Sequence, residues 1–116
     1  MYYRYHSPDY NCGIFVALET FLESMIVDRE EIDRLCLEFT AIFEDELPLP
    51  DPRGICYFTE KGNRKFHKAI IKMSNYLKRN GVNIVCDTLK DVSDKTVLYT
   101  DKYQIVLQKD EVKDNG

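Results

Sequence analysis

Residues 55–81 read "ICYFTEKGNRKFHKAIIKMSNYLKRNG", and this stretch predicts a buried strand that leads directly into a long helix. The first five residues are apolar, aromatic or β-branched, which is typical of a strand. The remainder places its apolar residues on one side of a helix, at Phe66, Ile70, Met73 and Leu77. We expect Gly81 to end the helix, because glycine adopts the left-handed cap conformation most readily.

Two more helices are predicted upstream of this stretch. Apolar residues recur at helical spacing over residues 14–25 and again over residues 28–46. Asp9 or Asn11 is expected to cap the first helix, and Asp28 the second. Because almost no linker separates them, the two helices are predicted to form an antiparallel hairpin.

The remaining segments predict strands and connections. Strands are expected at 1–6, 55–59, 82–89 and in a hairpin over 96–108 that turns at 100–102. The proline-rich segment 47–54 favours an extended connection. The order of elements predicts one α+β domain over residues 1–109, with a small, mainly antiparallel sheet and the helices on one face. The polar residues 110–116 are expected to form a frayed tail.

Composition limits the class of protein. The chain has 116 residues, of which 44% are hydrophobic, enough for one core. It has no apolar run near the roughly 18 residues that cross a bilayer, and the start lacks the order of a secretory signal, so a cytoplasmic protein without membrane contact is expected. Four cysteines lie inside apolar segments without close ligand pairs. We therefore expect reduced, mostly buried thiols and neither a metal site nor a cofactor.

Charge is distributed unevenly along the chain. Residues 1–52 hold 3 basic and 12 acidic side chains, a net charge of −9, whereas residues 53–116 hold 13 basic and 8 acidic, a net charge of +5. Such asymmetry steers a charged partner or attracts the two halves of the fold to each other.

The cationic residues of the third helix fall on one face, opposite its apolar face: Lys61, Arg64, Lys65, Lys68, Lys72 and Arg79. A face of this kind can follow the phosphates of a nucleic acid. It can also bind a protein partner, pair with the acidic helix 28–46 of the same chain, or remain solvated. The sequence leaves these four alternatives open.

The string "YFTEKG" at residues 57–62 resembles the end of the wing in winged helix-turn-helix regulators, where a strand leads into a C-terminal helix. The resemblance implies a nucleic-acid-binding regulator that uses helix 61–79.

The string "NCGIFV" at residues 11–16 resembles the nucleophile segment of SUMO-specific, Ulp1-like cysteine proteases. The resemblance implies a hydrolase with Cys12 as the nucleophile. A thiolate near a helix N-terminus is stabilised by the helix dipole, and His6 or His67 would act as the base. The alternative is a cysteine that packs as a small apolar side chain in the first helical turn.

The leading hypothesis is a protein-interaction module that binds a macromolecular partner without chemistry of its own. Its size and composition are typical of inhibitors or accessory proteins from bacteria or mobile elements. Besides the cationic helix, the candidate contact residues are the acidic Glu44, Asp45 and Glu46 and the tyrosines Tyr2, Tyr3 and Tyr5. The identity of the partner and the formation of homo-oligomers stay open.

Overall fold

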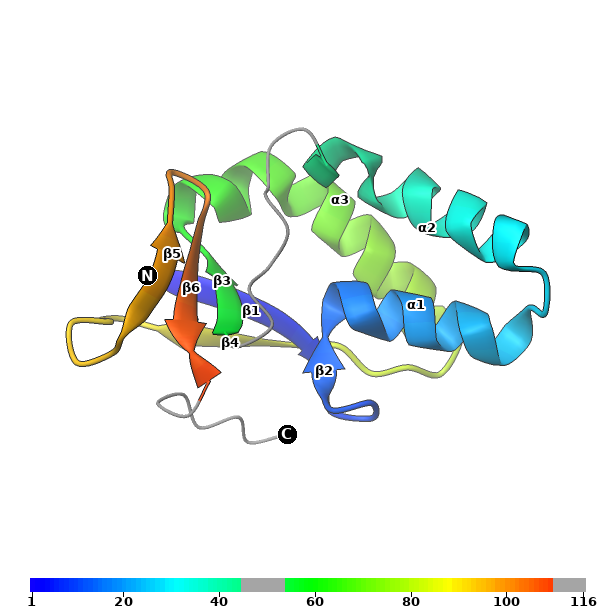
Figure 1. The fold of residues 1–116 in the computed structure, drawn as a ribbon, viewed down its shortest axis with the longest axis horizontal. Coiled ribbons are helices and arrows are strands. Elements are labelled where there is room, and N and C mark those ends of the chain that lie inside the picture. Colours follow the sequence, from blue (N-terminus) through cyan, green and yellow to red (C-terminus); the bar gives the residue numbers. More distant parts are fainter. Residues whose placement is uncertain (45–53, 110–116) are drawn as a thin grey trace.

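The computed structural model describes residues 1–44 and 54–109, which form three helices and six strands (Figure 1). The elements are β1 (Tyr2–Ser7), β2 (Cys12–Gly13), α1 (Ile14–Met25), α2 (Arg29–Glu44), β3 (Gly54–Phe58), α3 (Glu60–Arg79), β4 (Val85–Leu89), β5 (Val97–Thr100) and β6 (Gln104–Gln108). The predicted α+β class is confirmed, as are the antiparallel hairpin of α1 and α2 and the strand that leads directly into α3.

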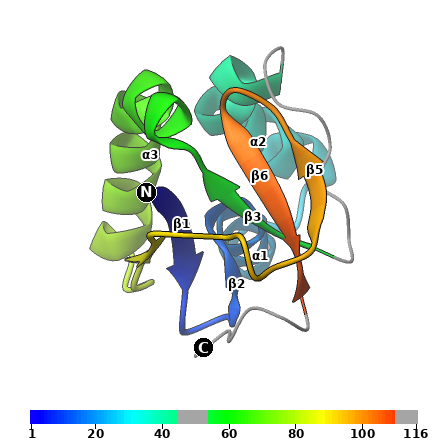
Figure 2. The ribbon, with the colours of Figure 1, turned by 90° about the vertical axis from the view of Figure 1, so that its left-hand side faces the viewer.

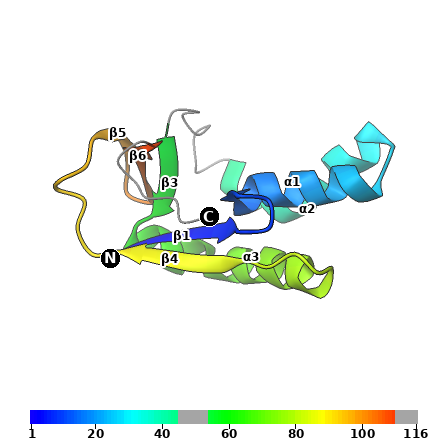
Figure 3. The ribbon, with the colours of Figure 1, turned by 90° about the horizontal axis from the view of Figure 1, so that it is seen from below.

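All strand pairs in the described part of the sheet are antiparallel. β1 pairs with β4 along one edge, while its other edge pairs with β2 and, through the single pair Tyr3 and Phe58, with β3. The sheet then continues from β3 to β6 and β5. Figure 3 shows the result: β1 and β4 form a ribbon along the molecule, and β3 stands across it. One pair therefore joins the two parts of the sheet.

The helices pack on one face of the sheet and enclose the main core (Figure 2). Phe66, Ile70, Met73 and Leu77 of α3 are completely buried, so the predicted apolar face of this helix is confirmed. The Phe66 ring lies 4.9 Å from the ring of Phe43 in α2. Burial of four large side chains fixes α3, because each contributes roughly 1.5–3 kcal/mol.

A second, smaller core lies on the other face of the sheet. It consists of Ile55, Tyr57, Ile105 and Leu107 from β3 and β6, with Tyr2, Leu89 and Val92 packed against them. Successive residues of a strand point to opposite faces, so β3 supplies Phe58 to the main core and Tyr57 to the second core. The near-continuous apolar sequence of β3 follows from this double burial.

The predicted cap of α1 is wrong. The N-cap residue is Gly13, and no side chain caps the helix. Asp9 instead accepts a hydrogen bond of 2.7 Å from the amide of Asn83, and Asn11 adopts a left-handed conformation with φ of 54°. The helix begins only at Ile14, because the chain reverses after β1 and Cys12 and Gly13 pair with β1 as strand β2.

Other predicted boundaries shift slightly. Gly81 adopts the left-handed conformation, with φ of 86°, directly after α3 and its C-cap residue Asn80, as predicted. The strand predicted over 82–89 begins at Val85. The proline-rich segment 47–53, Asp45 and Glu46, and the tail 110–116 lie outside the described residues. Within the described residues, none of the helices combines the length and the apolar character needed to cross a membrane.

Candidate functional site

The best-defined charged surface of the molecule lies on α3. We define the cationic face of α3 by the six predicted residues: Lys61, Arg64, Lys65, Lys68, Lys72 and Arg79. All six side chains are exposed, while the opposite side of the helix is buried. A rise of 1.5 Å per residue gives this face a length of about 27 Å.

The start of α3 is held by tertiary contacts. The Thr59 hydroxyl accepts a hydrogen bond of 3.1 Å from the amide of Gly62 and donates one of 2.7 Å to the carbonyl oxygen of Lys102. The Thr59 amide donates to the carbonyl oxygen of Tyr103 at 3.0 Å. A Cβ atom at Gly62 would lie 2.0 Å from that same carbonyl oxygen, so only glycine permits this approach. These contacts fix α3 against the turn between β5 and β6.

Most of the cationic face has no counter-ion within the described part of the chain. Among the side chains that the structure describes, no ion pair involves Lys61, Arg64, Lys68, Lys72 or Arg79. Glu60 is the single carboxylate of α3, and it binds the amino terminus at 3.5 Å instead. The face therefore presents positive charge that the described part of the fold does not neutralise.

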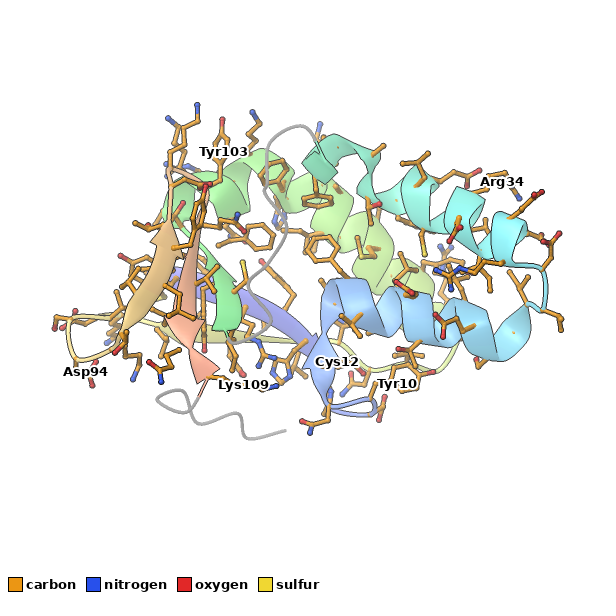
Figure 4. The ribbon with its side chains drawn as sticks, in the orientation of Figure 1. Tyr10, Cys12, Arg34, Asp94, Tyr103 and Lys109 are labelled. Carbon is orange, nitrogen blue, oxygen red and sulfur yellow. The ribbon has the colours of Figure 1, made fainter. Side chains whose placement is uncertain are left out.

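The turn between β5 and β6 extends this charged surface. The Lys65 ammonium donates a hydrogen bond of 2.9 Å to the Tyr103 hydroxyl and lies 4.6 Å from the centre of its ring. The Lys102 ammonium lies 4.9 Å from the same ring centre. The hydrogen bond from Lys65 lowers the pKa of Tyr103. Figure 4 shows Tyr103 where the turn meets α3.

Sequence reasoning did not find Lys102 and Tyr103. Lys102 lies in a predicted hairpin turn, and its sequence neighbours give no sign that this turn packs on the start of a helix 40 residues earlier. Only the contacts of Thr59 and Gly62 with the turn bring Lys102 beside Lys65.

The acidic helix does not neutralise α3 in the described residues. α2 and α3 meet through aromatic side chains, with the Phe39 and Tyr76 ring centres 4.8 Å apart. None of Lys61, Arg64, Lys68, Lys72 and Arg79 forms an ion pair with a described side chain of α2, so the predicted pairing is not found for these five residues. Of the predicted acidic contact residues, Glu44 ends α2, and Asp45 and Glu46 lie outside the described residues.

The carboxylates of α1 and α2 bind the two arginines of α2. Arg29 contacts Glu19 at 3.2 Å, Glu23 at 3.0 Å and Asp33 at 3.0 Å. Hydrogen bonds from Arg29 to Glu23 and Glu19 raise the pKa of its guanidinium. All of these side chains are about half exposed, so the pairs are surface pairs.

The predicted tyrosines make contacts inside the fold. Tyr3 donates a hydrogen bond of 2.9 Å to Glu60, and Tyr5 donates one to Asn63. Desolvation raises the pKa of Tyr5 to about 12. Tyr2 packs on the second core. These three residues connect β1 to α3 and to the sheet, and each retains partial exposure.

The structure does not bring Cys12 and a histidine together as a catalytic pair. Cys12 pairs with Ser7, the residue after His6, so the side chains of Cys12 and His6 point to opposite faces of the sheet. His6 is buried, and its Nε2 lies 2.7 Å from Asp87 Oδ2. His67 is exposed on α3. Cys12 packs against the main core at the start of α1 (Figure 4).

The four cysteines, all of them among the described residues, form no disulfide. Burial raises the pKa of the Cys56 thiol to about 12, and it also raises the pKa values of Cys36 and Cys86. Cys12, Cys36 and Cys56 are half-buried and Cys86 is exposed on β4, which differs from the prediction of mostly buried thiols. A raised pKa leaves these three thiols protonated at neutral pH and therefore poor nucleophiles.

The described residues contain no group of three side chains that could hold a metal ion. Comparison of the chain with protein-family models, curated proteins and solved structures found no match.

Proposed function

We propose that this protein is a small interaction module that binds an acidic surface of a partner protein through the cationic face of α3. The observation that supports the proposal is the set of five exposed cations without an ion pair to any described side chain. They are Lys61, Arg64, Lys68, Lys72 and Arg79. Their helix is anchored at its start and buried along its opposite side, so binding would cost little ordering of the backbone.

Two features favour a protein partner over a nucleic acid. The cationic face, which lies wholly within the described residues, displays no fully exposed aromatic ring, because Tyr103 is buried and Tyr76 and Phe39 are half-buried against each other at its edge. Exposed apolar side chains border the face, with Ile71 40% exposed on α3 and Ile42 53% exposed on α2. Protein interfaces combine apolar contacts with a charged rim, whereas phosphate binding needs mainly charge.

The test compares two triple charge reversals. One variant changes the face (Lys61→Glu, Arg64→Glu, Lys68→Glu), and its control makes the same change in net charge elsewhere (Lys78→Glu, Lys90→Glu, Lys109→Glu). Binding to immobilised poly-L-glutamate is measured by biolayer interferometry from about 50 to about 500 mM NaCl. We expect the first variant to bind at least about tenfold more weakly at low salt and the control to change by less than about threefold.

The same measurement with a mixed-sequence DNA duplex decides between the two partner classes. Equal loss in both variants would overturn the proposal, because it would mean that net charge and not the face of α3 determines binding. If the unmodified chain binds the duplex more tightly than polyglutamate, and only the first variant loses this binding, the partner is a nucleic acid and not a protein.

A further inference from the structure

The line of contact between α2 and α3 leaves apolar surface uncovered beside the cationic face. We define the α2–α3 seam by Leu35, Phe39 and Ile42 of α2 and by Ala69, Lys72 and Tyr76 of α3. The apolar members are half-buried except Ile42, which is 53% exposed. The three residues of α2 follow the spacing i, i+4 and i+7, so they form one straight row on that helix.

Aromatic rings and a lysine make up the centre of the seam. The Phe39 and Tyr76 ring centres lie 4.8 Å apart, and the Lys72 ammonium lies 5.5 Å from the centre of the Phe39 ring. Beneath them Tyr76 contacts Phe21 of α1, with ring centres 6.0 Å apart. The two aromatic rings of the seam are thus supported by the main core.

The two sides of the seam differ in how their charges are compensated. On the α3 side stand Lys68 and Lys72, which have no ion pair to a described side chain. On the α2 side stands Glu38, which Arg34 holds at 2.8 Å. A ligand with carboxylates on one flank would gain attraction where that flank faced α3, because Lys68 and Lys72 have no described counter-ion, whereas the α2 side presents Glu38 already paired with Arg34.

We propose that the seam binds an amphipathic, acidic helix of the partner protein. This inference rests on the proposed function and names the element that the cationic face would recognise. The apolar side of the ligand helix lies over Phe39 and Ile42, and its carboxylates face Lys68 and Lys72. Recognition of this kind places residues at i, i+3 or i+4, and i+7 of the ligand against an apolar surface.

The experiment uses a synthetic helical peptide as the probe. The peptide has about 21 residues, with leucine at heptad positions a and d and glutamate along one flank. Its binding to the full chain is measured by fluorescence anisotropy. Ile42→Ser removes exposed apolar surface in the seam, and Leu37→Ser is the matched control, because Leu37 is 48% exposed on the other side of α2.

We expect Ile42→Ser to weaken binding of the peptide at least about fivefold and Leu37→Ser to change it by less than about twofold. Binding of poly-L-glutamate should stay unchanged in both variants. Both side chains are exposed, so neither substitution should unfold the protein.

Three results would overturn the inference. If Ile42→Ser binds the peptide as tightly as the unmodified chain does, the seam is not the binding site. The proposed function would still hold in that case, provided that polyglutamate binding depends on Lys61, Arg64 and Lys68. If sedimentation shows a dimer that Ile42→Ser dissociates, a second copy of the chain occupies the seam. If neither the peptide nor polyglutamate binds, the inference and the proposed function both fail.

Discussion

Helices α2 and α3 lie side by side but differ in how their charges are satisfied. In α2 the two arginines, Arg29 and Arg34, both form ion pairs with carboxylates of α1 or α2. In α3, Lys61, Lys68 and Arg79 have no ion pair to a described side chain. α3 carries seven cationic residues and one glutamate, a net charge of +6. Positive charge is therefore concentrated on α3 largely without counter-ions among the described side chains, whereas both arginines of α2 are paired.

The two helices also differ in how they begin. α2 begins on a local cap, in which Asp28 Oδ1 accepts the amide of Glu30 at 3.0 Å. α3 begins on Thr59, whose hydroxyl accepts the amide of Gly62 as a local cap and in addition reaches the carbonyl oxygen of Lys102, 43 residues away in the chain. The contacts that hold the cationic face in place are consequently tertiary. Disrupting them should have larger effects than any change to the ion pairs of α2.

The largest effect is expected for Gly62→Ala. The added Cβ would lie 2.0 Å from the carbonyl oxygen of Tyr103, a backbone atom that cannot move aside without shifting the β5–β6 turn. We expect a loss of roughly 3 kcal/mol in the free energy of unfolding, measured by urea denaturation.

Gly13→Ala is the matched control, because a Cβ at Gly13 meets nothing within 4 Å and φ there is −66°. Its cost should stay within about 1 kcal/mol, the ordinary difference between glycine and alanine at an N-cap. Equal losses in the free energy of unfolding at the two positions would mean that the tight approach of α3 to the β5–β6 turn is not present in solution.

The next effect concerns Asp101, which shapes the turn that holds α3. Its Oδ1 accepts the amides of Tyr103 at 2.8 Å and Gln104 at 2.9 Å, and its Oδ2 accepts the Tyr99 hydroxyl at 2.7 Å. Partial burial acts to raise the pKa of Asp101, but the bonds from Tyr99, Tyr103 and Gln104 outweigh it and lower the pKa. Asp101→Asn removes the charge and should cost roughly 1 kcal/mol at neutral pH.

The sign of the pH dependence follows from the lowered pKa. The stabilisation by Asp101 is complete above the pKa of the unfolded chain and is lost as pH falls through the lower pKa of the folded state. The difference in stability between Asp101→Asn and the unmodified chain should therefore shrink below about pH 4. Asp94→Asn, at an exposed position between β4 and β5, makes the same change in charge and serves as the control. A constant difference down to about pH 2 would exclude this role for the carboxylate.

The parts of the fold that the sequence predicts well are those set by neighbouring residues. Helical spacing found α3 and its buried face, and Gly81 marked its end. The cap of α1 was predicted wrongly because Asp9 bonds to Asn83, 74 residues away. No local signal indicates that β1 pairs with β4 or that Cys12 and Gly13 form a strand.

The candidate site likewise has features that the local sequence predicts and features that depend on tertiary contacts. Helical geometry alone is enough to predict that Lys61, Lys68 and Lys72 share one face. The absence of counter-ions among the described side chains could not be predicted, because it depends on which side of α2 faces α3. Arg34 and Glu38 are an i, i+4 pair that the sequence allows, whereas the pair of Arg29 with Glu19 requires the α1–α2 hairpin.

The smallest effect, which also tests the contrast between the helices most sharply, is a change in Tm that differs in sign between a variant of α2 and a variant of α3. Arg29→Ala leaves three carboxylates without their cation and should lower Tm slightly, whereas Lys68→Ala relieves repulsion from Arg64 and Lys72 and should leave Tm unchanged or raise it. Both shifts should be no more than about 3 °C and should vanish near 1 M NaCl, because exposed charges are screened. Differential scanning calorimetry at low and high salt measures them. A fall in Tm for Lys68→Ala as large as that for Arg29→Ala would mean that Lys68 is already paired within the chain, and the cationic face would not be available to a partner.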